Sequence, residues 1–218
     1  MAKKVGIIHT SFVSVDYLKS LFAEILPEVE LFNIVDDSML AEVSKVGHIT
    51  PAIIRRICKY ALEAEALGAD LILNQCSSVS ESVDVAKQLI HIPYVKIDEA
   101  MAEEAVKIGG TISVVATVES TMGPSTRLIE RAAERMGRKV TIKKCLVDGA
   151  MYVLIREGKE KHNQLVKSVV EKAAAESDVV VLAQGSMVVL LDDLKEIKTP
   201  VLSSPRLGVL RVKETLGL

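Results

Sequence analysis

Val-Gly-Ile-Ile-His-Thr, residues 5–10, is an apolar run that ends on two polar residues. Short runs that are apolar on both faces are typical of strands in parallel sheets covered by helices. Ile-Ser-Val-Val-Ala-Thr, residues 112–117, has the same form 117 − 10 = 107 positions later. Each run therefore predicts a buried strand, with Thr10 and Thr117 at the carboxyl ends of the two strands.

Two further pairs of segments repeat at nearly the same distance. Ile-Pro-Tyr-Val at residues 92–95 matches Thr-Pro-Val-Leu at 199–202, and the prolines are 200 − 93 = 107 positions apart. Leu-Asn-Gln-Cys-Ser-Ser at 73–78 matches Leu-Ala-Gln-Gly-Ser-Met at 182–187, which sets Cys76 against Gly185 at a distance of 185 − 76 = 109. The two halves of the chain are therefore expected to have arisen by duplication of one segment.

The repeat predicts an α/β fold of two pseudo-symmetric domains, each a parallel sheet flanked by helices. The first domain is expected to comprise residues 1–97 plus 206–218, and the second residues 98–205. Ligands of open parallel sheets bind beyond the carboxyl ends of the strands. We therefore predict an active site in a cleft between the two domains, where equivalent loops face each other.

Alternating hydrophobic periods and turn residues predict the individual elements. Strands are predicted at residues 5–9, 29–34, 71–74, 94–97, 111–116, 140–146, 179–183 and 201–203. Helices are predicted at residues 15–26, 50–67, 80–89, 98–108, 125–136, 151–157, 162–176, 188–197 and from 207 onward. The helix at 50–67 has the clearest start, because Thr50 can cap it and Pro51 suits its first turn.

Composition excludes several classes of protein. The formal net charge is −2, and lysines and arginines form no basic patch, so a nucleic-acid partner is not expected. No apolar run approaches the roughly 18 residues of a membrane span, and the short apolar start predicts a strand, not a signal peptide. Three scattered cysteines fit a reducing cytoplasm, and His48, His91 and His162 lack companions at metal-ligand spacing, so no metal is expected.

The chain resembles the aspartate/glutamate/hydantoin racemase superfamily over nearly its whole length. Five segments of this sequence support the resemblance. They are Ile-Ile-His-Thr at 7–10, Asn-Gln-Cys-Ser-Ser at 74–78, Val-Val-Ala-Thr-Val-Glu-Ser-Thr at 114–121, Val-Leu-Ala-Gln-Gly-Ser-Met at 181–187 and Ser-Ser-Pro-Arg-Leu-Gly at 203–208. The resemblance implies two α/β domains around a small acid, no cofactor, and one catalytic cysteine from each domain.

The resemblance makes Cys76 the catalytic cysteine of the first domain. One thiolate in this family removes the proton next to a carboxylate, and a second thiol returns a proton. The matching position in the second domain is Gly185, and Cys145 lies on a predicted strand well before it. The chain thus resembles a family member that lacks the second cysteine, and His9 is a candidate for the missing acid or base.

The chemistry expected at Cys76 follows from its place between a strand and a helix. Ser78 to Glu81 fits a capping box, and the amino end of a helix lowers the pKa of a thiol and binds anions. The alternative is a packed core cysteine. Polar residues near the two equivalent turns and strand ends are expected to bind substrate: Thr10, Ser11, Asn74, Ser77, Ser78, Thr117, Gln184, Gly185 and Ser186.

Three functions remain open at this stage. The first is a cofactor-independent racemase or epimerase acting on a small carboxylate related to aspartate, glutamate or a hydantoin. The second is a one-sided decarboxylase or C–C lyase with Cys76 as its single proton donor. Arylmalonate decarboxylases resemble this family and also use one cysteine, though theirs lies in the other half. The third is a non-catalytic protein that binds a small acid. The resemblance also implies a possible homodimer.

Overall fold

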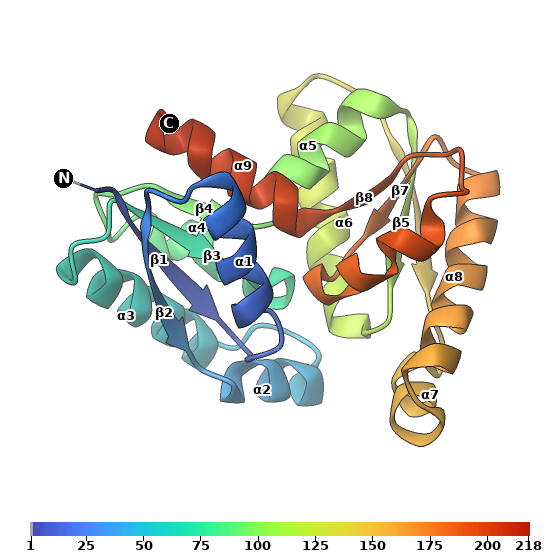
Figure 1. Cartoon of the computed structure of the whole chain (residues 1–218), viewed down its shortest axis with the longest axis horizontal. Coiled ribbons are helices and arrows are strands. Elements are labelled where there is room, and N and C mark those ends of the chain that lie inside the picture. The colour runs from blue at the N-terminus through green and yellow to red at the C-terminus, as the bar shows by residue number, and fades with distance from the viewer. Residues whose placement is uncertain (1) are drawn as a thin grey trace. The chain divides into compact units, whose positions relative to one another are not determined.

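The computed structural model describes residues 2–218 and shows strands alternating with helices along the chain (Figure 1). The α/β class predicted from the sequence is confirmed. The chain divides into two compact units. Unit 1 runs to Asp98 and resumes from Pro205 to Leu218, and unit 2 is Glu99–Ser204. The predicted domain boundaries lie one residue from these, and a gene duplication stays a proposal.

Unit 1 contains a four-stranded parallel sheet of order β2-β1-β3-β4. Its strands are β1 (Lys4–His9), β2 (Glu30–Val35), β3 (Leu71–Asn74) and β4 (Tyr94–Lys96). The central strand β1 pairs Ile8 with Asn74 of β3, so the carboxyl ends of these two strands lie side by side. This edge is where the sequence predicted the polar residues of the site.

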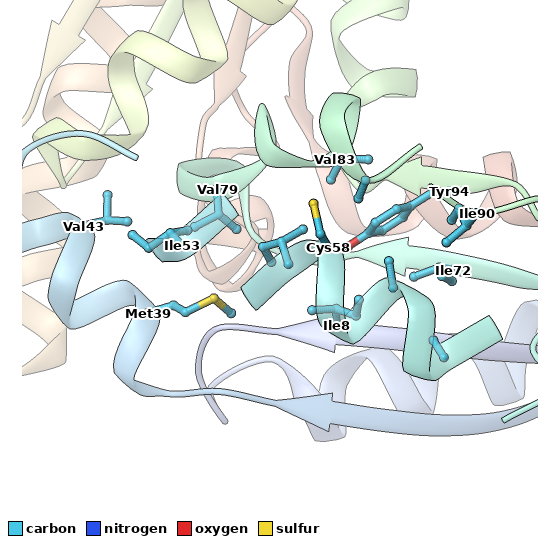
Figure 2. Packing of buried hydrophobic residues seen from close by; sticks show 14 residues of the cluster. Ile8, Met39, Val43, Ile53, Cys58, Ile72, Val79, Val83, Ile90 and Tyr94 are labelled. Atoms are coloured by element: carbon cyan, nitrogen blue, oxygen red, sulfur yellow. The ribbon is translucent and has the colours of Figure 1, made fainter. Parts of the chain in front are cut away.

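One face of this sheet is covered by α2 (Ser38–Val46), α3 (Pro51–Ala66) and the short α4 (Ser82–Ala86). Figure 2 shows the packed cluster, in which Met39, Ile53 and Val83 come from these helices and Ile8 and Ile72 from the strands. The start of α3 is as predicted, because Thr50 accepts a hydrogen bond from the Ile53 amide at 3.2 Å. Helix α1 (Val15–Ile25) covers the other face.

Unit 2 repeats this arrangement with the sheet order β6-β5-β7-β8. Its strands are β5 (Thr111–Ala116), β6 (Thr141–Leu146), β7 (Val179–Leu182) and β8 (Val201–Ser203). Its helices are α5 (Glu99–Ile108), α6 (Glu119–Arg135), α7 (Ala150–Glu157) and α8 (Lys159–Ala175), followed by the 3₁₀ segment Gly185–Leu194. Helix α8 and the 3₁₀ segment pack on the β-sheet face that includes Val115 and Leu182.

The last helix of each half packs in the other unit. Helix α5 follows β4 of unit 1 along the chain but belongs to unit 2. Helix α9 (Ser204–Leu216) follows β8 of unit 2, yet its Val209 and Val212 are fully buried with Val5 and Ile7 of unit 1. Gly208 permits this packing, since a Cβ there would lie 2.5 Å from the Ile97 carbonyl oxygen.

Several elements differ from the sequence prediction. Helix α2 was not predicted, and α6 begins at Glu119, so that Pro124 lies inside it. The helices predicted at 80–89 and 188–197 are a five-residue helix, α4, and a 3₁₀ segment. Both errors follow strand ends, where local propensity is overridden by the contacts of the turn. No helix within residues 2–218 is long and apolar enough to span a bilayer.

Candidate active site

The carboxyl edge of unit 1 brings Thr10 and Cys76 together. Thr10 directly follows β1, and Cys76 comes two residues after β3. The amide of Gln75 donates to the Ile8 carbonyl at 3.0 Å, which extends the strand pairing beyond the end of β3. Asn74 is fully buried, and its Nδ2 donates to the Cys76 carbonyl at 2.9 Å. The predicted polar cluster of unit 1 therefore includes a fixed turn around Cys76.

Cys76 is partly buried and packs against the hydrophobic cluster formed by α2, α3, α4 and the sheet of unit 1. Burial raises the pKa of the Cys76 thiol. Hydrogen bonds from the Thr10 hydroxyl, from the Ser78 amide and hydroxyl, and from the Val79 amide oppose this effect without cancelling it. The prediction of a lowered thiol pKa is therefore wrong.

The physical reason lies in the helix that follows. The residues from Ser77 to Val79 form a single 3₁₀ turn, and α4 begins only at Ser82 and has five residues. So short a helix has little of the macrodipole that a longer helix supplies. The predicted capping box from Ser78 to Glu81 does not begin α4, and Ser78 instead contacts the sulfur.

His9 lies at the end of β1 and is fully buried. Its Nε2 is 2.8 Å from Oδ1 of Asn33 on β2, a partner that the sequence analysis missed. Burial lowers the pKa of His9 and outweighs this hydrogen bond, which favours the neutral ring. Within residues 2–218, Nδ1 of His9 has no hydrogen-bond partner. A role as second acid or base would require this buried ring to reach a substrate.

The other predicted residues of unit 1 surround the same turn. Ser77 and Ser78 are buried in the 3₁₀ turn, whereas Ser11 is partly exposed after β1. Lys96, which was not predicted, is a buried lysine at the end of β4, and its Nζ lies 2.7 Å from Asp84 of α4. A lysine inside a predicted buried strand was the available signal.

The carboxyl edge of unit 2 contains Thr117 and Gln184. Thr117 directly follows β5, and its amide donates to Gln184 Oε1 at 2.7 Å. The Thr117 hydroxyl lies 3.2 Å from the same oxygen and accepts from Gln184 Nε2 at 2.9 Å. Gly185 and Ser186 begin the 3₁₀ segment, where Ser186 is exposed.

The hydrogen bonds of the two units identify equivalent residues. The Gln75 amide donates to the Ile8 carbonyl, and the Ala183 amide donates to the Val115 carbonyl in the same way. Equivalent residues in this region are therefore 183 − 75 = 108 positions apart in the sequence. Cys76 and Gln184 both have extended backbone, with φ of −112° and −120°, directly before a 3₁₀ turn. Gln184 is therefore the counterpart of Cys76, and the sequence match to Gly185 was wrong by one residue.

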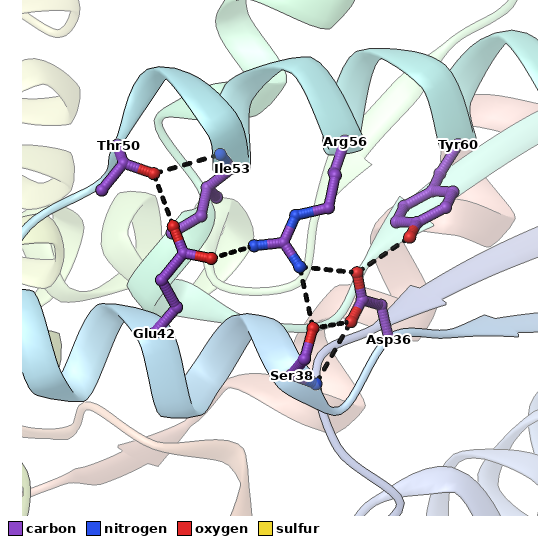
Figure 3. Close-up of polar contacts among 7 residues, drawn as sticks. All are labelled: Asp36, Ser38, Glu42, Thr50, Ile53, Arg56 and Tyr60. Atoms are coloured by element: carbon purple, nitrogen blue, oxygen red, sulfur yellow. Dashed lines mark hydrogen bonds and ion pairs between the residues drawn. The ribbon is translucent and has the colours of Figure 1, made fainter.

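A second polar cluster follows β2 and was not predicted. Arg56 of α3 lies between two carboxylates and a hydroxyl (Figure 3): it donates to Asp36 at 3.1 Å, to Ser38 at 2.8 Å and to Glu42. The Tyr60 hydroxyl also donates to Asp36, at 2.8 Å. Arg56, Asp36 and Glu42 are partly buried, and their pairing joins α2 to α3.

Other features of the described residues do not add to the predicted site. Among residues 2–218, no three side chains of His, Cys, Asp or Glu gather as metal ligands. A shallow hollow in unit 2 is lined by Glu160, Asn163, Gln164, Lys167 and Asp193, none of which was predicted as a site residue.

Comparisons with known proteins give one family. The family model described as Asp/Glu/Hydantoin racemase matches residues 5–212. Among solved structures, the allantoin racemase from Klebsiella pneumoniae has a TM-score of 0.74 at 15% identity, covering 99% of this chain and 88% of that one. An aspartate racemase homologue from Pyrococcus horikoshii has a TM-score of 0.74 at 18% identity over 100% of both chains.

The aspartate racemase of Picrophilus torridus has a TM-score of 0.70 at 17% identity, over 98% of this chain and 94% of that one. At these identities the structural likeness establishes the fold. No curated protein sequence matches the chain significantly.

Proposed function

The chain belongs to the Asp/Glu/hydantoin racemase family, and from this premise we propose that it is a cofactor-independent enzyme that moves a proton at the carbon next to a carboxylate. Cys76 is the group that takes or gives the proton. The substrate is a small acid related to aspartate, glutamate or a hydantoin, and the product is its racemate or epimer. That the active site lies between the two units stays a prediction.

The observation that supports the proposal best is the set of donors around Cys76. A thiolate is formed by proton loss from the thiol, and hydrogen bonds to sulfur favour the charged form. The Thr10 and Ser78 hydroxyls and the Ser78 and Val79 amides supply these hydrogen bonds. A packed core cysteine has no need of such donors, so the alternative of a purely structural Cys76 is disfavoured.

The same proposal assigns substrate binding to hydroxyls and amides near the strand ends. Ser11 and Ser77 are the candidates in unit 1, and Gly185 and Ser186 are the candidates in unit 2. Hydrogen bonds from such groups stabilise the enediolate-like charge that develops when the proton next to a carboxylate is removed.

The proposal is tested by exchange in heavy water. The protein is incubated with the two enantiomers of aspartate and of glutamate and with 5-substituted hydantoins, and α-deuterium is followed by NMR while optical rotation is recorded. We expect exchange with at least one compound, and its loss in Cys76→Ala. Cys145→Ser is the matched control, because Cys145 packs against the hydrophobic cluster of unit 2, and it keeps the exchange. Exchange that survives Cys76→Ala contradicts the proposal.

A second candidate function is favoured by the amide at Gln184. An amide does not take up or release protons at physiological pH, so unit 2 has no proton carrier at the position equivalent to Cys76. A decarboxylase or C–C lyase needs only one proton donor, which Cys76 supplies. Release of carbon dioxide from 2-substituted malonates, or of aldehyde from β-hydroxy acids, supports this candidate if it disappears in Cys76→Ala.

The pH profile separates the two candidates. Proton removal requires the thiolate, so racemisation increases as pH rises through the pKa of Cys76, which burial raises. Protonation after decarboxylation requires the thiol, so that activity falls over the same range. Binding of a small acid by calorimetry without either reaction, together with an unreactive thiol, indicates the third possibility, a non-catalytic binding protein.

A further inference from the structure

The position of Thr10 is fixed by the pairing of β1 with β3. Thr10 is only 1% exposed, and it directly follows β1. The Gln75 amide donates to Ile8 at 3.0 Å and keeps the chain beside β1 up to the residue before Cys76. The Thr10 hydroxyl is thereby held where it donates to the Cys76 sulfur. A β-branched side chain at a strand end has few rotamers, so the donor is held in a narrow range of positions.

Unit 2 builds the same pair with a different acceptor. Thr117 follows β5 as Thr10 follows β1, and the Ala183 amide donates to Val115 at 2.9 Å. Thr117 binds the side chain of Gln184, with its amide 2.7 Å and its hydroxyl 3.2 Å from Oε1. In both units the threonine after the central strand therefore binds the side chain that precedes the 3₁₀ turn.

We propose that Thr10 is a positioning residue that orients the Cys76 sulfur and stabilises its thiolate, in place of the substrate-binding role expected from the sequence. A threonine hydroxyl has one hydrogen to donate. In Thr10 that hydrogen is given to sulfur, so it is not available to a substrate carboxylate. The catalytic use of the thiolate rests on the proposed function, but the hydrogen bond from Thr10 to the sulfur does not.

The direction of the effect follows from charge. A hydrogen bond to an ionised acceptor is roughly twice as strong as one between neutral groups, so the Thr10 hydroxyl favours the thiolate over the thiol. The donors that surround this sulfur are all neutral: the Thr10 and Ser78 hydroxyls and two backbone amides. Burial raises the pKa of the Cys76 thiol and the Thr10 hydroxyl lowers it. Without this hydroxyl the thiol therefore ionises at higher pH.

The test is the titration of Cys76 without any substrate. Iodoacetamide alkylation of Cys76 is measured against pH, with mass spectrometry of the Cys76 peptide to separate it from Cys58 and Cys145. We expect Thr10→Val to raise the midpoint by about 0.5–1 pH unit, equivalent to roughly three- to tenfold less thiolate below the midpoint. Thr10→Ser, which keeps the hydroxyl, restores the wild-type midpoint.

Thr117→Val is the matched control, because it removes the equivalent hydroxyl of unit 2 and leaves the Cys76 midpoint unchanged. Thermal unfolding identifies a variant that does not fold, and Thr10→Ala then replaces Thr10→Val. The proposal is overturned by a wild-type midpoint in the hydroxyl-free variant, or by an equal increase in Thr117→Val. Failure of the proposed function is seen separately, as absence of exchange with every acid, and leaves this titration unaffected.

Discussion

At the scale of single residues, the important contrast is between Cys76 and Gln184. The two side chains have the same place in their units, but one is a thiol and the other is an amide. Thr117 binds both Oε1 and Nε2 of the Gln184 amide, which leaves the second N–H of Nε2 as the donor for another contact. Unit 2 can therefore offer a hydrogen-bond donor at this position, and unit 1 a proton carrier.

This contrast predicts a gain of function. Gln184→Cys puts a second thiol beside the Thr117 hydroxyl and amide. For any acid whose α-proton the protein exchanges, we expect the variant to have a higher ratio of the racemisation rate to the rate of α-deuterium exchange. Gly185→Cys, the variant that the sequence match would select, is the control and brings no such gain. Polarimetry and NMR on the same sample measure the two rates. A larger gain in Gly185→Cys contradicts the assignment of Gln184 as the counterpart of Cys76.

At the scale of secondary-structure elements, the cluster of Figure 3 explains how the short helix α2 is held. Asp37 before it and Gly47 after it are common helix-end residues, but α2 has only nine residues, too few to be stable as an isolated helix. Arg56 of α3 supplies the tertiary contact, since it binds Glu42 of α2 and Asp36 at the end of β2. Most helical stability in proteins comes from such packing and not from propensity, so sequence periodicity alone did not predict α2.

The cluster predicts a pH-dependent stability. Burial alone would raise the pKa of Asp36, but hydrogen bonds from Ser38 and Tyr60 and the Arg56 charge hold it below its ordinary value. A carboxyl with a lowered folded pKa stabilises the fold above its unfolded pKa of about 3.9 and loses this contribution as pH falls through the folded value. We expect Asp36→Asn to lower the free energy of unfolding by about 1–3 kcal/mol at neutral pH.

Urea unfolding at a series of pH values measures this effect. The difference between wild type and Asp36→Asn should shrink as the solution is acidified below about pH 4, because the wild-type carboxyl is then protonated as well. Asp37→Asn is the control, since Asp37 is exposed and lies next to Asp36 in the chain. A difference that stays constant down to low pH would show that the charge of Asp36 does not stabilise α2.

At the scale of the whole molecule, each unit contains one helix that follows a strand of the other unit in the chain. Helix α9 comes from the end of the chain and covers the sheet face formed by Val5, Ile7, Leu71 and Leu73 of unit 1. Burial of a valine such as Val209 or Val212 contributes roughly 1.5–3 kcal/mol. Unit 1 is therefore incomplete until the last residues of the chain are present.

This arrangement predicts how fragments behave. Residues 1–98 alone should not unfold cooperatively, whereas the same residues joined by a short linker to 205–218 should show a cooperative thermal transition by circular dichroism. A short linker is enough to connect residue 98 to residue 205, because Gly208 packs against the backbone of Ile97. In the joined fragment, Val209→Asp abolishes the transition and the exposed Leu210→Asp does not. Cooperative unfolding of residues 1–98 alone would contradict this account.

The sequence by itself determined the α/β class and the place of each strand in residues 2–218 to within one residue, and it is the source of the predictions that the chain is a duplication and that Cys76 is catalytic. These features depend on local pattern: apolar runs specify buried strands, and polar residues at their ends mark the edge where ligands bind. The resemblance to the racemases rested on the same segments, and the family match confirms it.

Only the tertiary structure decided that Gln184 is the counterpart of Cys76, that burial raises the pKa of the thiol, and that α9 completes unit 1. Each depends on contacts between residues far apart in the chain. Strand register places Gln184, the donors and apolar neighbours around sulfur set its pKa, and a buried valine stripe positions α9. A local sequence pattern contains no information about which distant segment supplies these neighbours.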